Sequence, residues 1–281
     1  MTHFTYGFVG LGQIGAPMAD RLAGPDLIVY DVRPEAMAPF ADKGARAATG
    51  LAEVAAADLI SLMVRDDAQV DEVADVLLPL AASGTVIAIH STIRVETAVT
   101  LAERAVPYGI EIVDAPVSGG AIGAAAGTLA VMAGCADEVF AKVKEPFGAW
   151  ASLVLHMGPV GAGTRAKLAR NLLHFTAFAA AAEAQRLAEA ADVPLGRLAR
   201  VVRHSDAVTG GPGAIMIRRT TAPLDAEDPL YPIMRHVFEL GDKDLTLALE
   251  LAAEVGVDTP LARLGHERLA ADLGLDLEDL R

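Results

Sequence analysis

The chain has 281 residues, of which 53% are hydrophobic and 21% are charged, a composition typical of globular rather than disordered proteins. Its length exceeds the commonest domain size, about 100–150 residues, so we expect two domains. The 37 acidic residues outnumber the 23 basic ones, and the resulting net charge of −14 repels nucleic acid and anionic membranes. We therefore expect neither as a partner, and a small anionic substrate would have to be bound by a few local cations and backbone amides.

The cysteine and histidine content and the N-terminal segment bear on metal binding and on the cellular compartment. The single cysteine, Cys135, cannot form an intramolecular disulfide, and the seven histidines lack metal-ligand spacing, so no metal site is predicted. The first residues carry neither a basic region nor an apolar stretch of the signal-peptide type. No apolar run reaches the roughly 20 residues that span a bilayer. These features favour a cytoplasmic protein.

Short apolar runs alternate with helical segments over the first half of the chain. Ala- and Leu-rich segments such as Ile14–Leu22 and Ala68–Leu78 carry apolar residues at helical spacing. The alternation predicts an α/β domain over residues 1–158, a doubly wound parallel sheet with helices on both faces. The runs with the length and composition of strands are Tyr6–Val9, Leu27–Tyr30, Leu59–Met63, Val86–Ile89 and Ile110–Val113.

The character of the sequence changes after residues 158–163, which read Gly-Pro-Val-Gly-Ala-Gly. From Thr164 onward no convincing strand follows, and a long helix is predicted from near Gly161 past Ala188 because no proline or glycine interrupts it. Residues 159–281 should form an all-α domain for substrate binding and self-association. Its Ala- and Leu-rich helices have more apolar surface than one small core needs, so we expect a homodimer or homotetramer.

A glycine motif lies between the first predicted strand and the helix that follows it. In this position the pattern is typical of a dinucleotide-binding (Rossmann) domain. The first glycine allows a tight turn, the second lets the backbone approach the pyrophosphate, and the third brings the helix against the strand. The helix N-terminus then offers free amides to the phosphates. The residues of the motif are Gly10, Leu11, Gly12, Gln13, Ile14 and Gly15.

An acidic residue at the end of the second strand bears on the choice of cofactor. Asp31 lies 21 positions after Gly10, where the ribose hydroxyls of a dinucleotide are expected. A carboxylate there accepts a hydrogen bond from the ribose 2′-hydroxyl and repels a 2′-phosphate, so NAD is predicted in preference to NADP. Arg33 leaves an alternative open, because it is either a solvated loop cation or a group that turns toward a 2′-phosphate.

A second glycine-rich passage begins at Asp114 and reads Asp-Ala-Pro-Val-Ser-Gly-Gly. It is too far from the first motif to hold the same pyrophosphate. The hydroxyl of Ser118, with the backbone amides beside Gly119 and Gly120, would suit a carboxylate. A purely structural turn is the alternative interpretation of this passage.

Lys167 and Asn171 are four residues apart on the predicted long helix and therefore share a face. A lysine on a mostly apolar helix that faces a cleft would be partly desolvated, which lowers its pKa toward the range of a general acid or base. Asn171 could then fix a substrate hydroxyl or carboxylate. The alternative is a lysine that extends to solvent beside an ordinary surface asparagine.

These motifs occur together over nearly the whole chain. They are Gly-Leu-Gly-x-x-Gly, Met63-Val64-Arg65-Asp66, Ser91-Thr92, the passage through Ser118, Gly161-x-Gly163-x-x-x-Lys167-x-x-x-Asn171 and Lys243-Asp244-Leu245. In this order they resemble the β-hydroxyacid dehydrogenases. That family includes 3-hydroxyisobutyrate dehydrogenase, tartronate semialdehyde reductase and 6-phosphogluconate dehydrogenase. The Ser118 and Lys167 motifs are specific to it rather than to dinucleotide folds in general.

The resemblance implies NAD-dependent oxidation of a small 3-hydroxy acid to its semialdehyde or keto acid, or the reverse reduction. It assigns Lys167 to the exchange of the hydroxyl proton and Asn171 to the orientation of the substrate. The residues that it assigns to the substrate carboxylate are Ser118, Gly119 and Gly120. Those that it assigns to the cofactor, besides the glycine motif, are Met63, Val64, Thr92 and Lys243.

The chain departs from the family pattern beside the predicted site and leaves three alternatives to consider. The departures are Arg65, His90, Arg94-Val95 and Arg170, which bear on substrate identity more than on reaction type. The alternatives are an imine reductase, an oxidative decarboxylase of the 6-phosphogluconate type, and a non-catalytic dinucleotide-binding oligomer. Imine reductases of this architecture replace the lysine, and a non-catalytic relative should have lost Lys167 or Asn171. Because both residues are present, the dehydrogenase is favoured, acting on a small carboxylate rather than a sugar phosphate.

Overall fold

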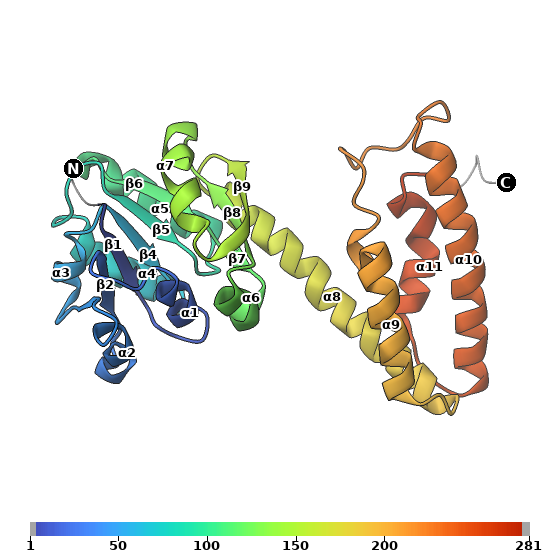
Figure 1. Ribbon diagram of the computed structural model, residues 1–281. Helices are drawn as coiled ribbons and strands as arrows, with labels where there is room; N and C mark the ends of the chain where they lie inside the picture. Colours follow the sequence, from blue (N-terminus) through green and yellow to red (C-terminus); the bar gives the residue numbers. More distant parts are fainter. Residues whose placement is uncertain (1–3, 277–281) are drawn as a thin grey trace. The chain divides into compact units, whose positions relative to one another are not determined.

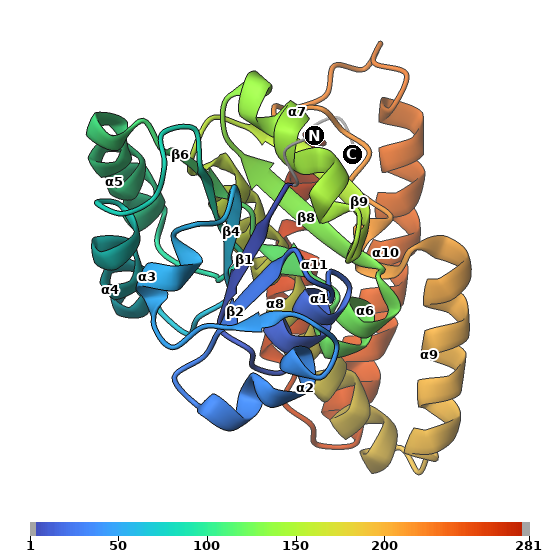
Figure 2. The ribbon, with the colours of Figure 1, turned by 60° about the vertical axis from the view of Figure 1, so that its left-hand side comes forward.

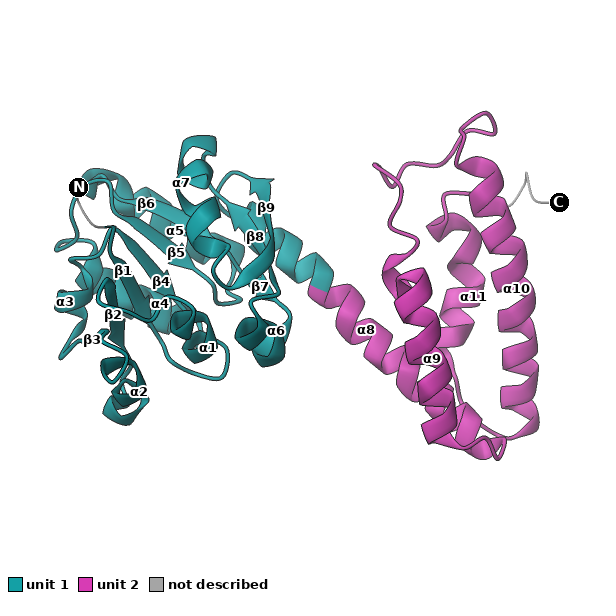
Figure 3. Ribbon diagram, in the orientation of Figure 1, with its two compact units in different colours: residues 1–170 teal, residues 171–281 magenta. Residues whose placement is uncertain are grey.

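The computed structural model of the protein describes residues 4–276. The chain divides into two compact units, residues 1–170 and 171–281 (Figure 3). All strands of the described residues lie in the first unit. The described part of the second unit, residues 171–276, contains helices and no strands. The predicted fold class, an α/β dinucleotide-binding domain followed by an all-α domain, is therefore confirmed.

A single sheet organises the first unit (Figure 1). Its neighbours run β3-β2-β1-β4-β5-β6-β8-β7, and β9 pairs with β8. All pairs are parallel except β6 with β8 and β7 with β8. The strands among the described residues are β1 (Tyr6–Val9), β2 (Leu27–Tyr30), β3 (Arg46–Ala47), β4 (Leu59–Leu62), β5 (Val86–Ile89), β6 (Glu111–Asp114), β7 (Val117–Ser118), β8 (Leu129–Gly134) and β9 (Ala151–Gly158).

The five predicted strands all exist. Those at Tyr6–Val9, Leu27–Tyr30 and Val86–Ile89 match residue for residue, while β4 ends one residue earlier than predicted and β6 lies one residue later. The strands β3, β7, β8 and β9 were not predicted from the sequence. The passage after Ser118 also contains a short helix, α6, which begins at Gly120.

Alternate residues of the central strands face two separate cores, because side chains along a strand point to opposite faces. On β1, Phe8 belongs to one core and Val9 to the other; on β5, Ala88 and Ile89 divide in the same way. Burial on both faces explains why these strands read as continuous apolar runs rather than as alternating ones.

Helices cover both faces of the sheet. One core includes residues of α1, α2, α6 and α7, and the other includes residues of α3, α4 and α5. Figure 2 shows the second group on one side of the strands and α1, α6 and α7 on the other. The helices are α1 (Gly15–Asp20), α2 (Ala38–Ala41), α3 (Leu51–Val54), α4 (Asp67–Leu77), α5 (Val95–Ala105), α6 (Gly120–Ala126) and α7 (Asp137–Phe147), with 3₁₀ turns at Pro34–Ala36 and Val106–Tyr108.

The long helix predicted from near Gly161 is α8, Ala162–Ala190, which begins in the first unit and continues into the second. The second unit adds α9 (Leu195–Thr209), a 3₁₀ turn (Gly211–Gly213), α10 (Tyr231–Glu254) and α11 (Pro260–Asp272). A small core that includes Tyr231 and Met234 of α10 and Ala270 of α11 lies within this unit. No helix within residues 4–276 has the length and apolarity needed to cross a lipid bilayer.

The buried carboxylate of Glu183, on α8, fixes the start of α11. Its two oxygens accept hydrogen bonds from the backbone amides of Leu261 (2.9 Å) and Ala262 (3.1 Å). The first amides of a helix have no partner within the helix, and Thr259, which precedes α11, does not cap them with its side chain. Glu183 therefore supplies the cap from another helix of the same unit.

His90, one of the departures from the family pattern, lies inside the first unit with only 1% of its surface exposed. Its Nδ1 lies 2.8 Å from the carbonyl oxygen of Ala115, and its Nε2 lies 3.1 Å from Ser61 Oγ. Because a carbonyl can only accept, Nδ1 carries the hydrogen, and Nε2 accepts from the Ser61 hydroxyl. The ring also makes edge contacts with Phe147 and Trp150, so this histidine joins β4, β5 and β6 inside the core.

Burial lowers the pKa of His90 from 6.5 to about 4, which makes the first unit acid-sensitive. The neutral ring stabilises the folded state fully above pH 6.5, and that contribution is lost as the pH falls toward 4. At about 1.4 kcal/mol for each pH unit the loss amounts to about 3 kcal/mol. In His90→Asn, which cannot titrate, the free energy of unfolding should fall less over this range, so that the gap to the wild type narrows by about that amount.

Urea unfolding from pH 7.5 to 4.5, followed by the fluorescence of Trp150, measures this difference, because the chain has one tryptophan and it packs against His90. The exposed His236→Asn variant is the control for the loss of an imidazole outside this core. Parallel curves for the wild type and His90→Asn would contradict the prediction.

Candidate active site

The site lies where four parallel strands end. Because parallel strands that pair in register end at the same edge of a sheet, the segments after β1, β4, β5 and β6 lie along one edge. These segments are the glycine motif, the Met63–Val64 segment, Ser91–Thr92 and the passage through Ser118. Ser91 Oγ donates a hydrogen bond to the carbonyl of Val64 at 2.7 Å and so ties two neighbouring segments together.

A cavity of about 810 Å³ occupies the part of this edge near β1, β2 and β4. Of the predicted cofactor residues, those that line it are Gly10, Gly12, Gln13, Ile14, Gly15, Asp31, Arg33, Met63 and Val64. Leu11 is buried beside it, Thr92 is exposed after β5, and Lys243 lies in α10 of the other unit, paired with Asp244 at 3.1 Å. The structure thus gathers most of the predicted cofactor residues of the first unit around one cavity, but its lining does not include Thr92.

Part of this lining was not predicted from the sequence. The additional residues are Val9, Tyr30, Val32, Leu51, Arg65, Gln69, Glu72 and Val73. Several of them belong to the start of α4, where the Asp66 side chain caps the helix by accepting from the amide of Gln69 at 3.0 Å. An aspartate three residues before a glutamine at the start of an apolar helix is a signal that could have located this wall.

The three motif glycines serve the three different purposes expected of them. Gly10 has φ +93°, and a Cβ there would lie 2.3 Å from the carbonyl oxygen of Met63. A Cβ on Gly15 would lie 2.0 Å from the carbonyl oxygen of Gly10, so the helix could not approach the strand. At Gly12 no atom lies within 4 Å of a Cβ position, which leaves the backbone open to the cavity. A phosphate group fits such an open turn.

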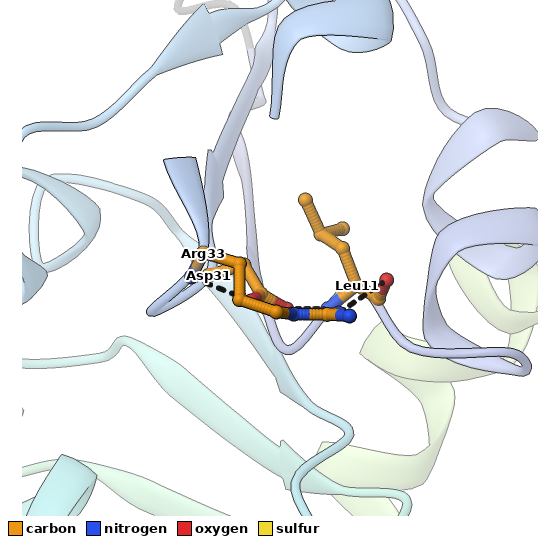
Figure 4. A network of polar contacts seen from close by, with 3 residues as sticks. All are labelled: Leu11, Asp31 and Arg33. Atoms are coloured by element: carbon orange, nitrogen blue, oxygen red, sulfur yellow. Dashed lines mark hydrogen bonds and ion pairs between the residues drawn. The ribbon is translucent and has the colours of Figure 1, made fainter. Parts of the chain in front are cut away.

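Asp31 is held from two sides at the end of β2 (Figure 4). One carboxylate oxygen accepts from the amide of Leu11 at 2.7 Å, and the other accepts from the amide and the Nε of Arg33 at 2.9 and 3.1 Å. Burial raises the pKa of Asp31, but the hydrogen bonds from Arg33 and Leu11 outweigh it, so the pKa lies below its ordinary value. Arg33 is paired with Asp31, and 56% of its side chain is exposed, so its two interpretations, a solvated loop cation or a group that turns toward a 2′-phosphate, stay predictions.

Lys167 is buried in the first turns of α8, with 8% of its surface exposed. Its Nζ donates a hydrogen bond to the carbonyl oxygen of Val117 at 2.6 Å. Burial lowers the pKa of the ammonium group, and the positive charge of Arg170 lowers it further. The interpretation as a lysine extended to solvent is therefore wrong for this geometry.

The same hydrogen bond brings Lys167 to the second glycine-rich passage. Val117 directly precedes Ser118, Gly119 and Gly120, of which Ser118 is partly exposed and the two glycines are exposed. Asn171 follows one turn after Lys167 on α8 and belongs to the other unit. Within the first unit, therefore, a buried amine is bonded to the residue that directly precedes Ser118, Gly119 and Gly120.

Taken together, the glycine turn, the cavity and the buried lysine define the class of the protein as a dinucleotide-binding oxidoreductase. Comparison with known proteins gives the family. Residues 5–158 match the NAD binding domain of 6-phosphogluconate dehydrogenase. Residues 161–278 match a profile described as NAD-binding of NADP-dependent 3-hydroxyisobutyrate dehydrogenase. The chain belongs to the β-hydroxyacid dehydrogenase family, and the predicted resemblance is confirmed.

Curated relatives cover almost the whole chain. An uncharacterized oxidoreductase of Mycobacterium tuberculosis is 58% identical over 97% of this chain and 94% of its own. The 3-hydroxyisobutyrate dehydrogenase of Pseudomonas aeruginosa is 32% identical over 96% of this chain and 93% of its own. An NAD-dependent L-serine dehydrogenase of the same organism is 35% identical over 92% of this chain and 88% of its own.

Solved structures agree with this assignment. A crystal structure of an oxidoreductase from Mycobacterium avium 104 has a TM-score of 0.94 and 55% identity, covering 97% of this chain and 99% of its own. An imine reductase of Myxococcus stipitatus in complex with NADP⁺ has a TM-score of 0.74 at 16% identity. The match covers 94% of this chain and 92% of the imine reductase chain. At that identity the likeness concerns the fold alone.

Proposed function

We propose that this protein is an NAD-dependent dehydrogenase of a small 3-hydroxy carboxylate, with Lys167 as the general acid and base. The observation that carries the proposal is the buried Lys167 amine, bonded to the carbonyl of Val117 directly before Ser118. The names of two relatives support the substrate class. Both 3-hydroxyisobutyrate and L-serine carry a primary hydroxyl group on the carbon next to the one that bears the carboxylate.

The residues of the first unit fit a nicotinamide dinucleotide. The open turn at Gly12 would receive the pyrophosphate, and Asp31 would lie at the ribose. When bound, the nicotinamide supplies the acceptor for a hydride in oxidation and the donor in reduction. The protein's own residues must then bind the acid, orient it and move one proton.

The geometry around Lys167 suits that proton transfer. A neutral amine has two N–H groups and one lone pair, and the bond to Val117 uses one N–H group. The lone pair can then accept the proton of a substrate hydroxyl as the carbon loses its hydride. In the reverse direction the ammonium donates that proton to the developing alkoxide. The lowered pKa makes the neutral form more accessible than it is for a solvent-exposed lysine.

A single carboxylate matches the groups beside Lys167 better than a phosphate does. The hydroxyl of Ser118 and the amides of Gly119 and Gly120 can each donate one hydrogen bond to it. A phosphate carries nearly two charges and usually takes two or more convergent cations. Arg218 and Arg219, two adjacent cations of the helical half, are followed by acidic residues at 225, 227 and 228. These features favour the small acid over a sugar phosphate.

Removing the amine should abolish proton transfer but leave cofactor binding. For Lys167→Ala we expect kcat to fall about 100-fold or more, with the Kd for NAD within about twofold of the wild-type value. In the wild type the oxidation rate should fall on the acid side, as Lys167 becomes protonated, and this limb should be absent from the variant. Steady-state kinetics across pH and NAD titration measure both. A variant that turns over normally while binding NAD would contradict the assignment.

The cofactor preference should depend on Asp31 rather than on Arg33. We expect kcat/KM with NAD to exceed that with NADP by at least about tenfold, or roughly 1.4 kcal/mol. Asp31→Asn should reduce this ratio, because it removes the charge that repels a 2′-phosphate. Arg33→Ala should not reduce it, because its guanidinium partly neutralises Asp31. Equal efficiencies in the wild type, or a preference for NADP, would show that Arg33 outweighs Asp31, and a lower ratio in Arg33→Ala would contradict the neutralising role of Arg33.

The substrate class can be tested with one panel. We expect the highest kcat/KM for a three- to five-carbon acid among 3-hydroxyisobutyrate, L-serine, glycerate and 3-hydroxypropionate, without release of carbon dioxide. 6-Phosphogluconate and a cyclic imine serve as the comparisons. The reaction is followed by the absorbance of NADH, and carbon dioxide is measured in parallel. A preference for the phosphosugar, or carbon dioxide formed in step with NADH, would instead support the decarboxylating branch of the family.

A further inference from the structure

The start of α8 is capped by a carboxylate from a distant part of the chain. Asp114, the last residue of β6, is fully buried, and its oxygens accept from the amides of Gly161 at 2.7 Å and Thr164 at 2.6 Å. Gly161 has φ +90°, a conformation that favours glycine, and a glycine has no side chain with which to cap the helix. Asp114 therefore takes the role that a serine or aspartate usually has at the N-terminus of a helix.

The first turn of α8 has almost no space in which to move. A Cβ on Gly163 would lie 2.2 Å from the carbonyl oxygen of Met132, and a Cβ on Gly134 would lie 2.3 Å from Asp114 Oδ1. The helix thus approaches the ends of β6 and β8 as closely as backbone atoms allow. These close approaches leave little room for the Asp114 carboxylate, or for the amides that donate to it, to move.

Asp114 is linked to Lys167 by two routes. Through its hydrogen bond to the amide of Thr164 it holds the turn of α8 from which Lys167 projects. Along the backbone, Asp114 is three residues before Val117, whose carbonyl accepts a hydrogen bond from Lys167 Nζ. The hydrogen bonds and the chain together form a closed ring. It runs from the Asp114 carboxylate through the first turns of α8 to the Lys167 amine, and back through the carbonyl of Val117.

We propose that Asp114 is a positioning residue for proton transfer: its carboxylate fixes Lys167 Nζ beside the Ser118 passage and acts on the reaction only through that lysine. This inference rests on the proposed role of Lys167. An error of about 1 Å in the placement of a reacting group can cost about 100-fold in rate, so the loss of this link should be visible in kcat. Cofactor binding at Gly12 and Asp31 lies elsewhere along the edge and should be unaffected.

The first measurement does not depend on activity. The chain has five lysines, and the four besides Lys167 are exposed, so lysine-selective ¹³C labelling gives a small set of signals that Lys167→Ala assigns. In the wild type the Lys167 signal should titrate below the ordinary pKa of a lysine. In Asp114→Asn, which loses one acceptor, the titration of Lys167 should move up toward that ordinary value. Glu183→Gln is the matched control, because Glu183 also caps a helix with two accepted bonds but does so in the other unit.

The second measurement is a double-mutant cycle in kcat. Asp114→Asn should lower kcat about 10- to 100-fold with the Kd for NAD unchanged, whereas in the Lys167→Ala background the same change should alter kcat less than about twofold. Should Asp114→Asn not fold, Asp114→Ser, which keeps one acceptor on a shorter side chain, takes its place in both measurements.

The outcomes separate the two proposals. An unchanged Lys167 titration in Asp114→Asn, or an equal loss of kcat in both backgrounds, overturns the positioning role. If Lys167→Ala alone keeps its kcat, the proposed function fails, and the titration still decides whether Asp114 holds the amine. A titration that moves equally in Glu183→Gln would attribute the effect to general loosening and would also overturn the proposal.

Discussion

Parallel pairing of strands that are buried on both faces is the constraint on which the first unit depends. Since each central strand alternates between two cores, as Phe8 and Val9 do on β1, a shift of one residue would exchange the two sets of side chains. The register is therefore strongly specified, and the strands end together at one edge. Polar and glycine residues can gather there because the residues after each strand no longer need to fill a core. The glycine turn, the Met63–Val64 segment and the passage through Ser118 all follow from that geometry.

Buried carboxylates then fix the helices to this frame. Asp114 caps α8 from the end of a strand, and Glu183, on α8 itself, caps α11 within the second unit. Each carboxylate satisfies two amides that a helix leaves without partners. Caps of this kind typically contribute about 1–2 kcal/mol each, and their geometry is more exact than that of apolar packing. The first turn of α8 is thus fixed by the carboxylate of Asp114, and a later turn of α8 provides the carboxylate of Glu183 that caps α11.

The sequence was sufficient for the features that depend on neighbouring residues. Apolar runs predicted the central strands, an uninterrupted helical stretch predicted α8, and the glycine spacing predicted the turn at Gly10. β8 was missed because its Ala- and Gly-rich run, Leu129–Gly134, lacks the β-branched composition of the other strands, and it joins β6 through the single pair Asp114 and Gly134. Its place depends on a contact between residues 20 positions apart, which no local pattern encodes.

The hydrogen bonds within the candidate site were harder to predict from the sequence than the residues that form it. The burial of Lys167 was expected, but its partner is a backbone carbonyl, which leaves no mark on the residue type at position 117. The capping role of Asp114 joins groups 47 and 50 residues apart, so the capping pattern usual at a helix start is absent from the sequence around Gly161. The roles of Thr92, Asn171 and Lys243, and the expected self-association, stay predictions.

Burial and local charge, rather than the net charge of −14, set the pKa values of Lys167 and Asp31. A surplus of carboxylates would on its own raise the pKa of a lysine, yet that of Lys167 is lowered, because burial and the nearby Arg170 outweigh it. At physiological ionic strength exposed charges are screened beyond about 8 Å, so most of the acidic surface has little influence on a buried amine. At Asp31 the same rule holds, since Arg33 and the Leu11 amide lower its pKa inside an acidic protein. Under the proposed function, a carboxylate substrate would meet amides, a hydroxyl and an amine at Ser118, while the distant surface would govern only how often it arrives.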